Sequence, residues 1–205
     1  MSYLACDFLI FYEENCHDHW AGGLFRPQYE ELLRRLELDG YVLREGQLYR
    51  SEADVLDFEE ETGLLENLYS SLALPNKSIT FEFLKLSEDH YVTGHWSDCI
   101  ANSRKFLEAI LQQVTERFSG LKGVTISEKS LERPVEVRNF LEAQNLLEHK
   151  EREAVDKIYG LLSHTGSHPY MAEKDQARLL RQISLTMTQF ALLRLEGAIQ
   201  EYGKP

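Results

Sequence analysis

The sequence predicts a mainly α protein, in which a helical bundle follows a small α+β extension made of one helix and one β-hairpin. Beyond residue 51, apolar residues recur at intervals of three, four and seven, which is typical of amphipathic helices. A short alternation of apolar and polar residues marks 41–49 as a hairpin. The chain has 205 residues, 43% of them hydrophobic, which suffices for one sizeable core and an appendage. We therefore assign 1–50 to the extension and 51–205 to the bundle.

The predicted helix of the extension begins at Pro27, because a proline's fixed φ suits the first helical position and its missing N–H is not needed there. The helix runs to about Asp39 and ends at Gly40, and residues 41–49 then turn at Glu45-Gly46. The extension's positive charge is largely cancelled, so we expect no DNA binding. The positive charges are those of Arg26, Arg34, Arg35, Arg44 and Arg50, and the negative charges that cancel much of them are those of Glu30, Glu31, Glu37 and Asp39.

The bundle is predicted to contain six helices. Ser51 caps the first, and the third carries a regular apolar face. Residues 119–133, rich in Gly, Lys and Ser, are predicted as a surface loop. The six helices are expected from Ser51, from Ser78 to Thr93, from Ser97 or Asp98 to Phe118, from Pro134, from Lys150 to Leu162, and from Asp175 to Tyr202. The third helix presents Ile100, Leu107, Leu111, Val114 and Phe118, and the last presents Ala177, Leu180, Ile183, Met187, Phe190, Leu193 and Ala198.

Charge and composition restrict the function. The sequence has 22 basic and 34 acidic residues, and the resulting net charge of −12 opposes binding that depends on neutralising phosphates. RNA could therefore bind only at a small local basic cleft. No apolar run reaches the ~20 residues of a membrane helix. Three cysteines, an odd number without framework spacing, favour a reducing compartment, so we expect a cytoplasmic protein that does not bind membranes.

The segment 160–169 concentrates the most chemistry. His164 and His168 are four residues apart, and imidazoles titrate near neutrality, so they can act as acid, base or ligand. Gly166 and Pro169 predict a turn, and no nearby acidic residue or cysteine completes a metal-ligand set, so we expect neither a metal nor a cofactor. The histidines are candidates for acid–base catalysis of phosphoester transfer, with Ser163, Thr165 and Ser167 as substrate-binding partners. An equally good interpretation is structural, with one histidine capping a helix and the other packing beneath the turn.

Two arginines follow in the next predicted helix. Arg178 and Arg181 stand one and two turns from its start, where a guanidinium group could hold a phosphate with two hydrogen bonds. The alternative is that they form salt bridges with Glu173, Asp175 or a facing helix.

Three stretches together resemble a known family. The helix 102–111, the segment 159–169 and the start of the closing helix, 175–178, are similar to the HEPN superfamily, especially the C-terminal helical domain of prokaryotic abortive-infection proteins. The resemblance covers about 78–202. It implies a helical bundle, often dimeric, that acts as a toxin in antiviral defence and cleaves RNA without metal, with the RNA 2′-hydroxyl attacking its own phosphate.

The family motif, an arginine followed four to six residues later by a histidine, is only half present. His168 occupies the histidine position, and Gly166 and Ser167 match the small residues before it. Positions 161–163 are Leu, Leu and Ser, so the arginine is missing, and Pro169 replaces a small residue. Loss of a preorganised cation from a phosphorane-like transition state costs several kcal/mol. The resemblance thus implies either an endoribonuclease that uses His168, His164 and Arg178 or Arg181, or a catalytically inert subunit that forms a dimer or binds a partner protein.

Overall fold

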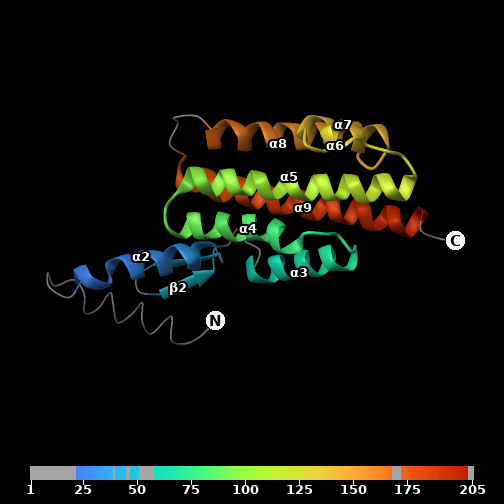
Figure 1. Cartoon of the computed structure of the whole chain (residues 1–205). Coiled ribbons are helices and arrows are strands. Elements are labelled where there is room, and N and C mark those ends of the chain that lie inside the picture. Colours follow the sequence, from blue (N-terminus) through green and yellow to red (C-terminus); the bar gives the residue numbers. More distant parts are fainter. Residues whose placement is uncertain (1–21, 39, 45–46, 51–57, 168–171, 203–205) are drawn as a thin grey trace. The chain divides into compact units, whose positions relative to one another are not determined.

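The computed structural model of the chain describes residues 22–38, 40–44, 47–50, 58–167 and 172–202 (Figure 1). The described part is mainly helical, with one two-stranded sheet, which confirms the predicted fold class. The chain divides into two compact units, Met1–Gly63 and Leu64–Pro205. The predicted boundary after residue 50 adjoins 51–57, which lie outside the described residues.

The first unit contains helix α2 (Gly22–Leu38) and a hairpin of strands β1 (Tyr41–Arg44) and β2 (Gln47–Arg50). The strands are antiparallel, with Tyr41 opposite Arg50 and Arg44 opposite Gln47, so the predicted hairpin is confirmed. Gly40 joins helix to strand at φ 78°, a conformation that glycine adopts without strain. The helix begins at Gly22 instead of Pro27, so Pro27 lies inside it.

Acidic residues neutralise the arginines of α2 on the same helix. Arg26 and Arg34 both pair with Glu30, and Arg35 pairs with Glu31. These pairs join positions four residues apart, which are neighbours on a helix surface.

The second unit is built around a long central helix, α5. Figure 1 shows α5 and α9 running side by side, with α8 and α7 along one side of α5 and α4 along another. Helix α3 begins at Phe58, and Ser51, the predicted cap, lies outside the described residues. The helices are α3 (Phe58–Ser71), α4 (Lys77–Val92), α5 (Trp96–Lys122), α6 (Glu128–Leu131), α7 (Pro134–Ala143), α8 (His149–Ser167) and α9 (Lys174–Tyr202).

The core of this unit lies on α5, as the periodicity predicts. Its five predicted core residues, Ile100, Leu107, Leu111, Val114 and Phe118, are at most 3% exposed. The predicted loop 119–133 is partly wrong, because α5 continues to Lys122 and α6 forms a further short helix within it. Gly123 ends α5 at φ 66°, and Ser127 caps α6 through its side chain, so local capping determines both helix ends.

The outer side of α9 differs from the prediction. Ala177, Leu180 and Ala198 of the predicted face are buried, but Leu193 is 48% exposed. Leu179, which is not part of that face, is 55% exposed. Three further apolar residues of the predicted face, Ile183, Met187 and Phe190, are only half-buried. The helix therefore has two apolar faces, of which one packs in the bundle, chiefly against α5, and the other points outward.

Candidate functional site

The end of α8 contains the segment that concentrates the chemistry. Residues 163–167 are helical and do not form the predicted turn, since α8 continues to Ser167. A helical glycine such as Gly166 costs only about 1 kcal/mol relative to alanine, which the packing of α8 against α5 and α9 outweighs.

The predicted site residues on α8 face different surroundings. The Ser163 side chain is half-buried and lies near that of Tyr159, one turn earlier. His164 is exposed. Thr165 and Ser167 lie in the helix, but their side chains are outside the described part, as is the whole of His168. The pairing of His164 with His168 therefore stays a prediction, because His168 lies outside the described residues.

The two predicted phosphate-binding arginines also differ. Arg178 is half-buried near the start of α9, and among the described residues it forms no ion pair. Arg181 is 2% exposed and lies close enough to the buried Cys99 for its charge to favour the thiolate. Burial has the larger effect and raises the pKa of the Cys99 thiol. Arg181 is thus a core residue and does not present its guanidinium to a ligand at the surface.

Arg181 is near a polar layer between α4 and α5. Ser87 and Ser103 hydroxyls are 2.7 Å apart, and each donates a hydrogen bond to the Cys99 carbonyl oxygen, at 3.1 and 2.9 Å. These contacts explain how hydroxyl groups are accommodated inside an otherwise apolar core.

A second polar network, which the sequence analysis did not find, joins α5, α7 and α8. The Tyr159 hydroxyl donates to Glu108 Oε1 at 2.6 Å, and the Arg138 guanidinium stacks on the Tyr159 ring 4.3 Å from its centroid. Arg138 also forms an ion pair with Asp156. Burial, together with the bond to Glu108, raises the pKa of Tyr159. No spacing signal in the sequence joins these residues, because they come together only when three helices pack.

The network extends toward the start of α8. Arg152 pairs with both Asp156 and Glu142, and His149 Nδ1 lies 2.7 Å from Glu142 Oε1. Hydrogen bonds from His149 and Arg152 lower the pKa of Glu142. The α7–α8 contact is therefore held by alternating charges at its outer edge.

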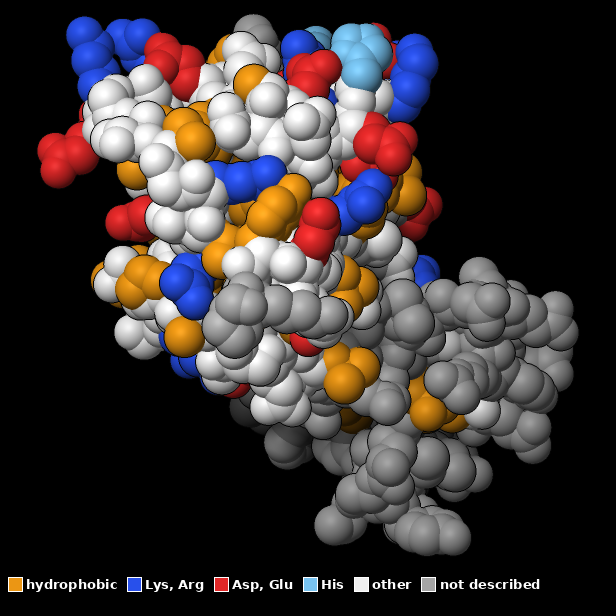
Figure 2. Space-filling view, turned by 90° about the vertical axis from the view of Figure 1, so that its right-hand side faces the viewer, with side chains coloured by type: hydrophobic (Ala, Val, Ile, Leu, Met, Phe, Trp, Pro, Cys, Tyr) orange, Lys and Arg blue, Asp and Glu red, His pale blue; other side chains and the backbone are white. Residues whose placement is uncertain are grey.

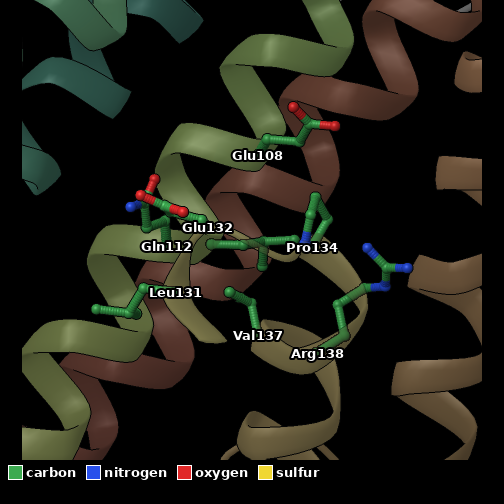
Figure 3. A pocket seen from close by; sticks show the side chains of 8 residues that line it. Glu108, Gln112, Leu131, Glu132, Pro134, Val137 and Arg138 are labelled. Carbon is green, nitrogen blue, oxygen red and sulfur yellow. The ribbon is translucent and has the colours of Figure 1, made fainter. Parts of the chain in front are cut away.

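A pocket of about 80 Å³ opens beside this network, between α5 and the α6–α7 segment (Figure 3). In the figure, Arg138 extends from α7 toward the right of the view, and the carboxylate of Glu108, from α5, lies above the other lining side chains. Its lining residues are Glu108, Leu111, Gln112, Leu131, Glu132, Pro134, Val137 and Arg138. The pocket therefore combines an aliphatic wall with charged groups of both signs.

The outer face of α9 is a further candidate surface. Between Leu179 and Leu193 the only charged residue is Arg181, which is buried. At the end of the bundle where α9 terminates, by contrast, charged side chains of both signs lie among hydrophobic ones (Figure 2). An exposed helix face without charge over four turns is unusual for a surface helix and typical of an interface.

Comparisons with known proteins give no relative: no family model matches the sequence, and neither the curated proteins nor the solved structures contain a significant match. Within the described ranges, no three metal-ligating side chains come together. None of the described helices has the length and apolar character needed to cross a bilayer.

Proposed function

We propose that the chain is a HEPN-like helical subunit of a prokaryotic antiviral defence system, and that it works by self-association through the outer face of α9 and not by cutting RNA. The observation that carries the proposal is the uncharged outer face itself, with Leu179 and Leu193 about half exposed at its two ends. Burial of such residues is favourable by about 25 cal/mol per Å². The burial of Arg181 supports it further, because one of the two candidate phosphate ligands is withdrawn from the surface.

The partner that fits this face is a second copy of the same chain. The apolar residues are arranged almost symmetrically about Thr186: Leu179 and Leu193 are each seven residues away, and Ile183 and Phe190 are three and four. An antiparallel pair of α9 helices with its two-fold axis at Thr186 would therefore match Leu179 with Leu193 and Ile183 with Phe190. A self-complementary patch is what two-fold symmetry requires.

Thr186, at the centre of the outer face of α9, can be buried in an interface. The Thr186 hydroxyl donates to the carbonyl oxygen of Gln182 on its own helix at 3.0 Å, so burial leaves no hydroxyl without a partner. Threonine is also small enough for two helices to approach closely at this point.

Charges at one edge are complementary in the same arrangement. Arg178 and Glu196 are 18 residues apart, which is five helical turns, so they lie on one edge of α9. In the antiparallel pair, each Arg178 lies within about 3 Å along the axis of the level of Glu196 in the second copy. One helix face is smaller than the roughly 800 Å² per partner of a standard interface, so we expect a micromolar dissociation constant.

Sedimentation velocity over a concentration series tests the self-association. We expect a monomer–dimer equilibrium for the wild type and a monomer for Leu179→Glu and Leu193→Glu. Ile79→Glu is the matched control, since Ile79 is 62% exposed on α4, and it should associate like the wild type. A wild-type chain that stays monomeric at all concentrations would exclude the proposal.

Orientation has its own test. Arg178→Glu should weaken the dimer, and the double variant Arg178→Glu/Glu196→Arg should restore it. A double variant no tighter than the single one would exclude the antiparallel arrangement. The defence role is tested by phage plating on cells that express the wild type or Leu179→Glu, with protection expected only from the wild type.

A metal-independent endoribonuclease is the second candidate, favoured by the exposed His164 and the half-buried Arg178 on two helices that contact each other. In this function a histidine, His168 or His164, takes the proton of the RNA 2′-hydroxyl, and Arg178 stabilises the charge that develops on the phosphate oxygens.

Total RNA and tRNA are incubated with the protein in EDTA, beside His164→Ala and His168→Ala. His149→Ala is the control, because His149 is an exposed histidine at the other end of α8. Equal cleavage by all four proteins would exclude this function.

A further inference from the structure

The exposed apolar surface of α9 continues onto the neighbouring helix α8. The two helices contact each other, and Arg194 of α9 forms an ion pair with Glu151, near the start of α8. This pair shows which side of α8 and which side of α9 face each other. Residues three, four and seven apart share one side of a helix, so the same sides can be followed along both helices from the ion pair.

Beyond the ion pair, the facing sides of α8 and α9 are apolar and partly open to solvent. Starting from the ion pair, the side of α8 carries Glu151, Ala154, Ile158 and Leu161, and the side of α9 carries Arg194, Phe190, Met187 and Ile183. We call the apolar members of both sets the α8–α9 strip. Leu161 is 53% exposed and Ala154 is exposed, whereas the other members are half-buried. The strip thus has its most exposed large side chain on α8.

The α8–α9 strip adjoins the surface that we propose for self-association, and the inference made here rests on that proposal. Ile183 and Phe190 belong to both surfaces, so a partner that covers the outer face of α9 also reaches the strip. One helix face is smaller than the roughly 800 Å² per partner of a standard interface. A second helix supplies area that α9 alone lacks, and Leu161 is the α8 residue that gains most from burial.

The two-fold axis at Thr186 brings the strips of two copies together. Helices α8 and α9 run in opposite directions (Figure 1), so if Glu151 is level with Arg194, the α8 residue level with Thr186 is Tyr159. Leu161 then lies about 3 Å from the level of the two-fold axis, on the opposite side from Met187 and Phe190 of its own chain. Rotation by the axis moves Leu161 of the second copy to within about 3 Å, along the helix, of the levels of Met187 and Phe190.

The outer side of α8 is open at this level. Gly160 is exposed, and no atom lies within 4 Å of the position that a Cβ would take there. A two-fold axis perpendicular to the helices also keeps equivalent sides of the two copies together, so α8 meets α8 where α9 meets α9. No side chain of Gly160 holds the two α8 helices apart.

We propose that α8 takes part in the self-association, and that Leu161 of each copy packs against Met187 and Phe190 of the second copy. The occupant of the strip is a second copy because the strip is continuous with the self-complementary face of α9 and shares its two-fold axis. The contact is reciprocal, so each dimer contains it twice.

Sedimentation velocity on the full chain tests the role of Leu161. Leu161→Glu should raise the dimer dissociation constant by about tenfold or more, because it places a charge in an apolar contact on both sides of the dimer. Leu161→Met keeps the apolar volume and should associate like the wild type. Leu64→Glu is the matched control, since Leu64 is 56% exposed on α3, on the opposite side of α5 from α8 (Figure 1). It should also associate like the wild type.

Crosslinking tests the contact itself. A Leu161→Cys chain is mixed with a mass-tagged Met187→Cys chain, both in a Cys6→Ser/Cys16→Ser background, and treated with a short bismaleimide. Cys99 is 0% exposed and should not react. A band with the summed mass of the tagged and untagged chains is expected, and a Leu64→Cys chain mixed with the Met187→Cys chain should give none.

The outcomes separate this inference from the proposal on which it rests. A wild type that stays monomeric excludes both. If the wild type forms dimers but Leu161→Glu associates equally well, or the mixed crosslinked band is absent, the inference about α8 is overturned and self-association through α9 stands.

Discussion

Tyr159→Phe isolates one hydrogen bond that ties α8 to α5. The substitution deletes the hydroxyl that donates to Glu108 at 2.6 Å and leaves the ring on which Arg138 stacks. A hydrogen bond to an ionised group contributes about 1.5–3 kcal/mol, and because Glu108 is partly exposed we take a value around the lower limit of that range, about 1–2 kcal/mol. For a chain of this size that corresponds to a fall in the melting temperature of roughly 2–8 °C.

The assay is thermal unfolding at neutral pH, followed by circular dichroism at a helical wavelength. Tyr202→Phe is the matched control, since Tyr202 is 45% exposed at the end of α9 and its ring, which faces Lys122, is retained. Its melting temperature should equal that of the wild type. A Tyr159→Phe protein as stable as the wild type would refute the assignment of this bond as a stabilising contact.

The contribution of the Tyr159–Glu108 hydrogen bond to stability should also depend on pH in the alkaline range. The pKa of Tyr159 is raised in the folded chain, so the stabilisation is fully present below the unfolded value of about 10 and is lost as pH rises through the folded value. The stability difference between wild type and Tyr159→Phe should therefore stay constant from pH 7 to pH 9 and shrink above about pH 10. Tyr69, whose pKa burial also raises, is present in both proteins and cancels. A difference that is unchanged above pH 10 would contradict the cause given for the shift.

Three further predictions concern the bundle. Leu107→Ala, at a position with 0% exposure, should lower the free energy of unfolding by about 2–5 kcal/mol in denaturant titrations, whereas a loss below about 1 kcal/mol would mean that the core can collapse into the space. Glu142→Gln should remove part of the fall in stability below about pH 4.5, because the pKa of Glu142 is lowered on folding and its contribution is lost as pH falls through that lowered value; an unchanged acid limb would contradict this. In a Cys6→Ser/Cys16→Ser chain, Cys99 should react with a thiol reagent only on unfolding, since it is buried and its pKa is raised; fast labelling of the folded chain would contradict the burial.

The elements that could be predicted from sequence are those whose signal is local. The hairpin at 41–50 and the core face of α5 follow from apolar periodicity and glycine placement, and both are confirmed. The turn predicted at 163–167 is wrong because glycine and serine are only weakly unfavourable in a helix, and the contacts of α8 with α5 and α9 decide its length.

The candidate sites were less accessible to sequence reasoning. Its place two turns from a helix start makes Arg181 a candidate either for phosphate binding or for a salt bridge, but packing decides which side of α9 faces α5, and Arg181 is on the buried side. For the same reason the periodicity places Leu193 on the buried face, although it is 48% exposed. Glu108, Arg138 and Tyr159 come from three helices, so no spacing in the sequence could bring them together.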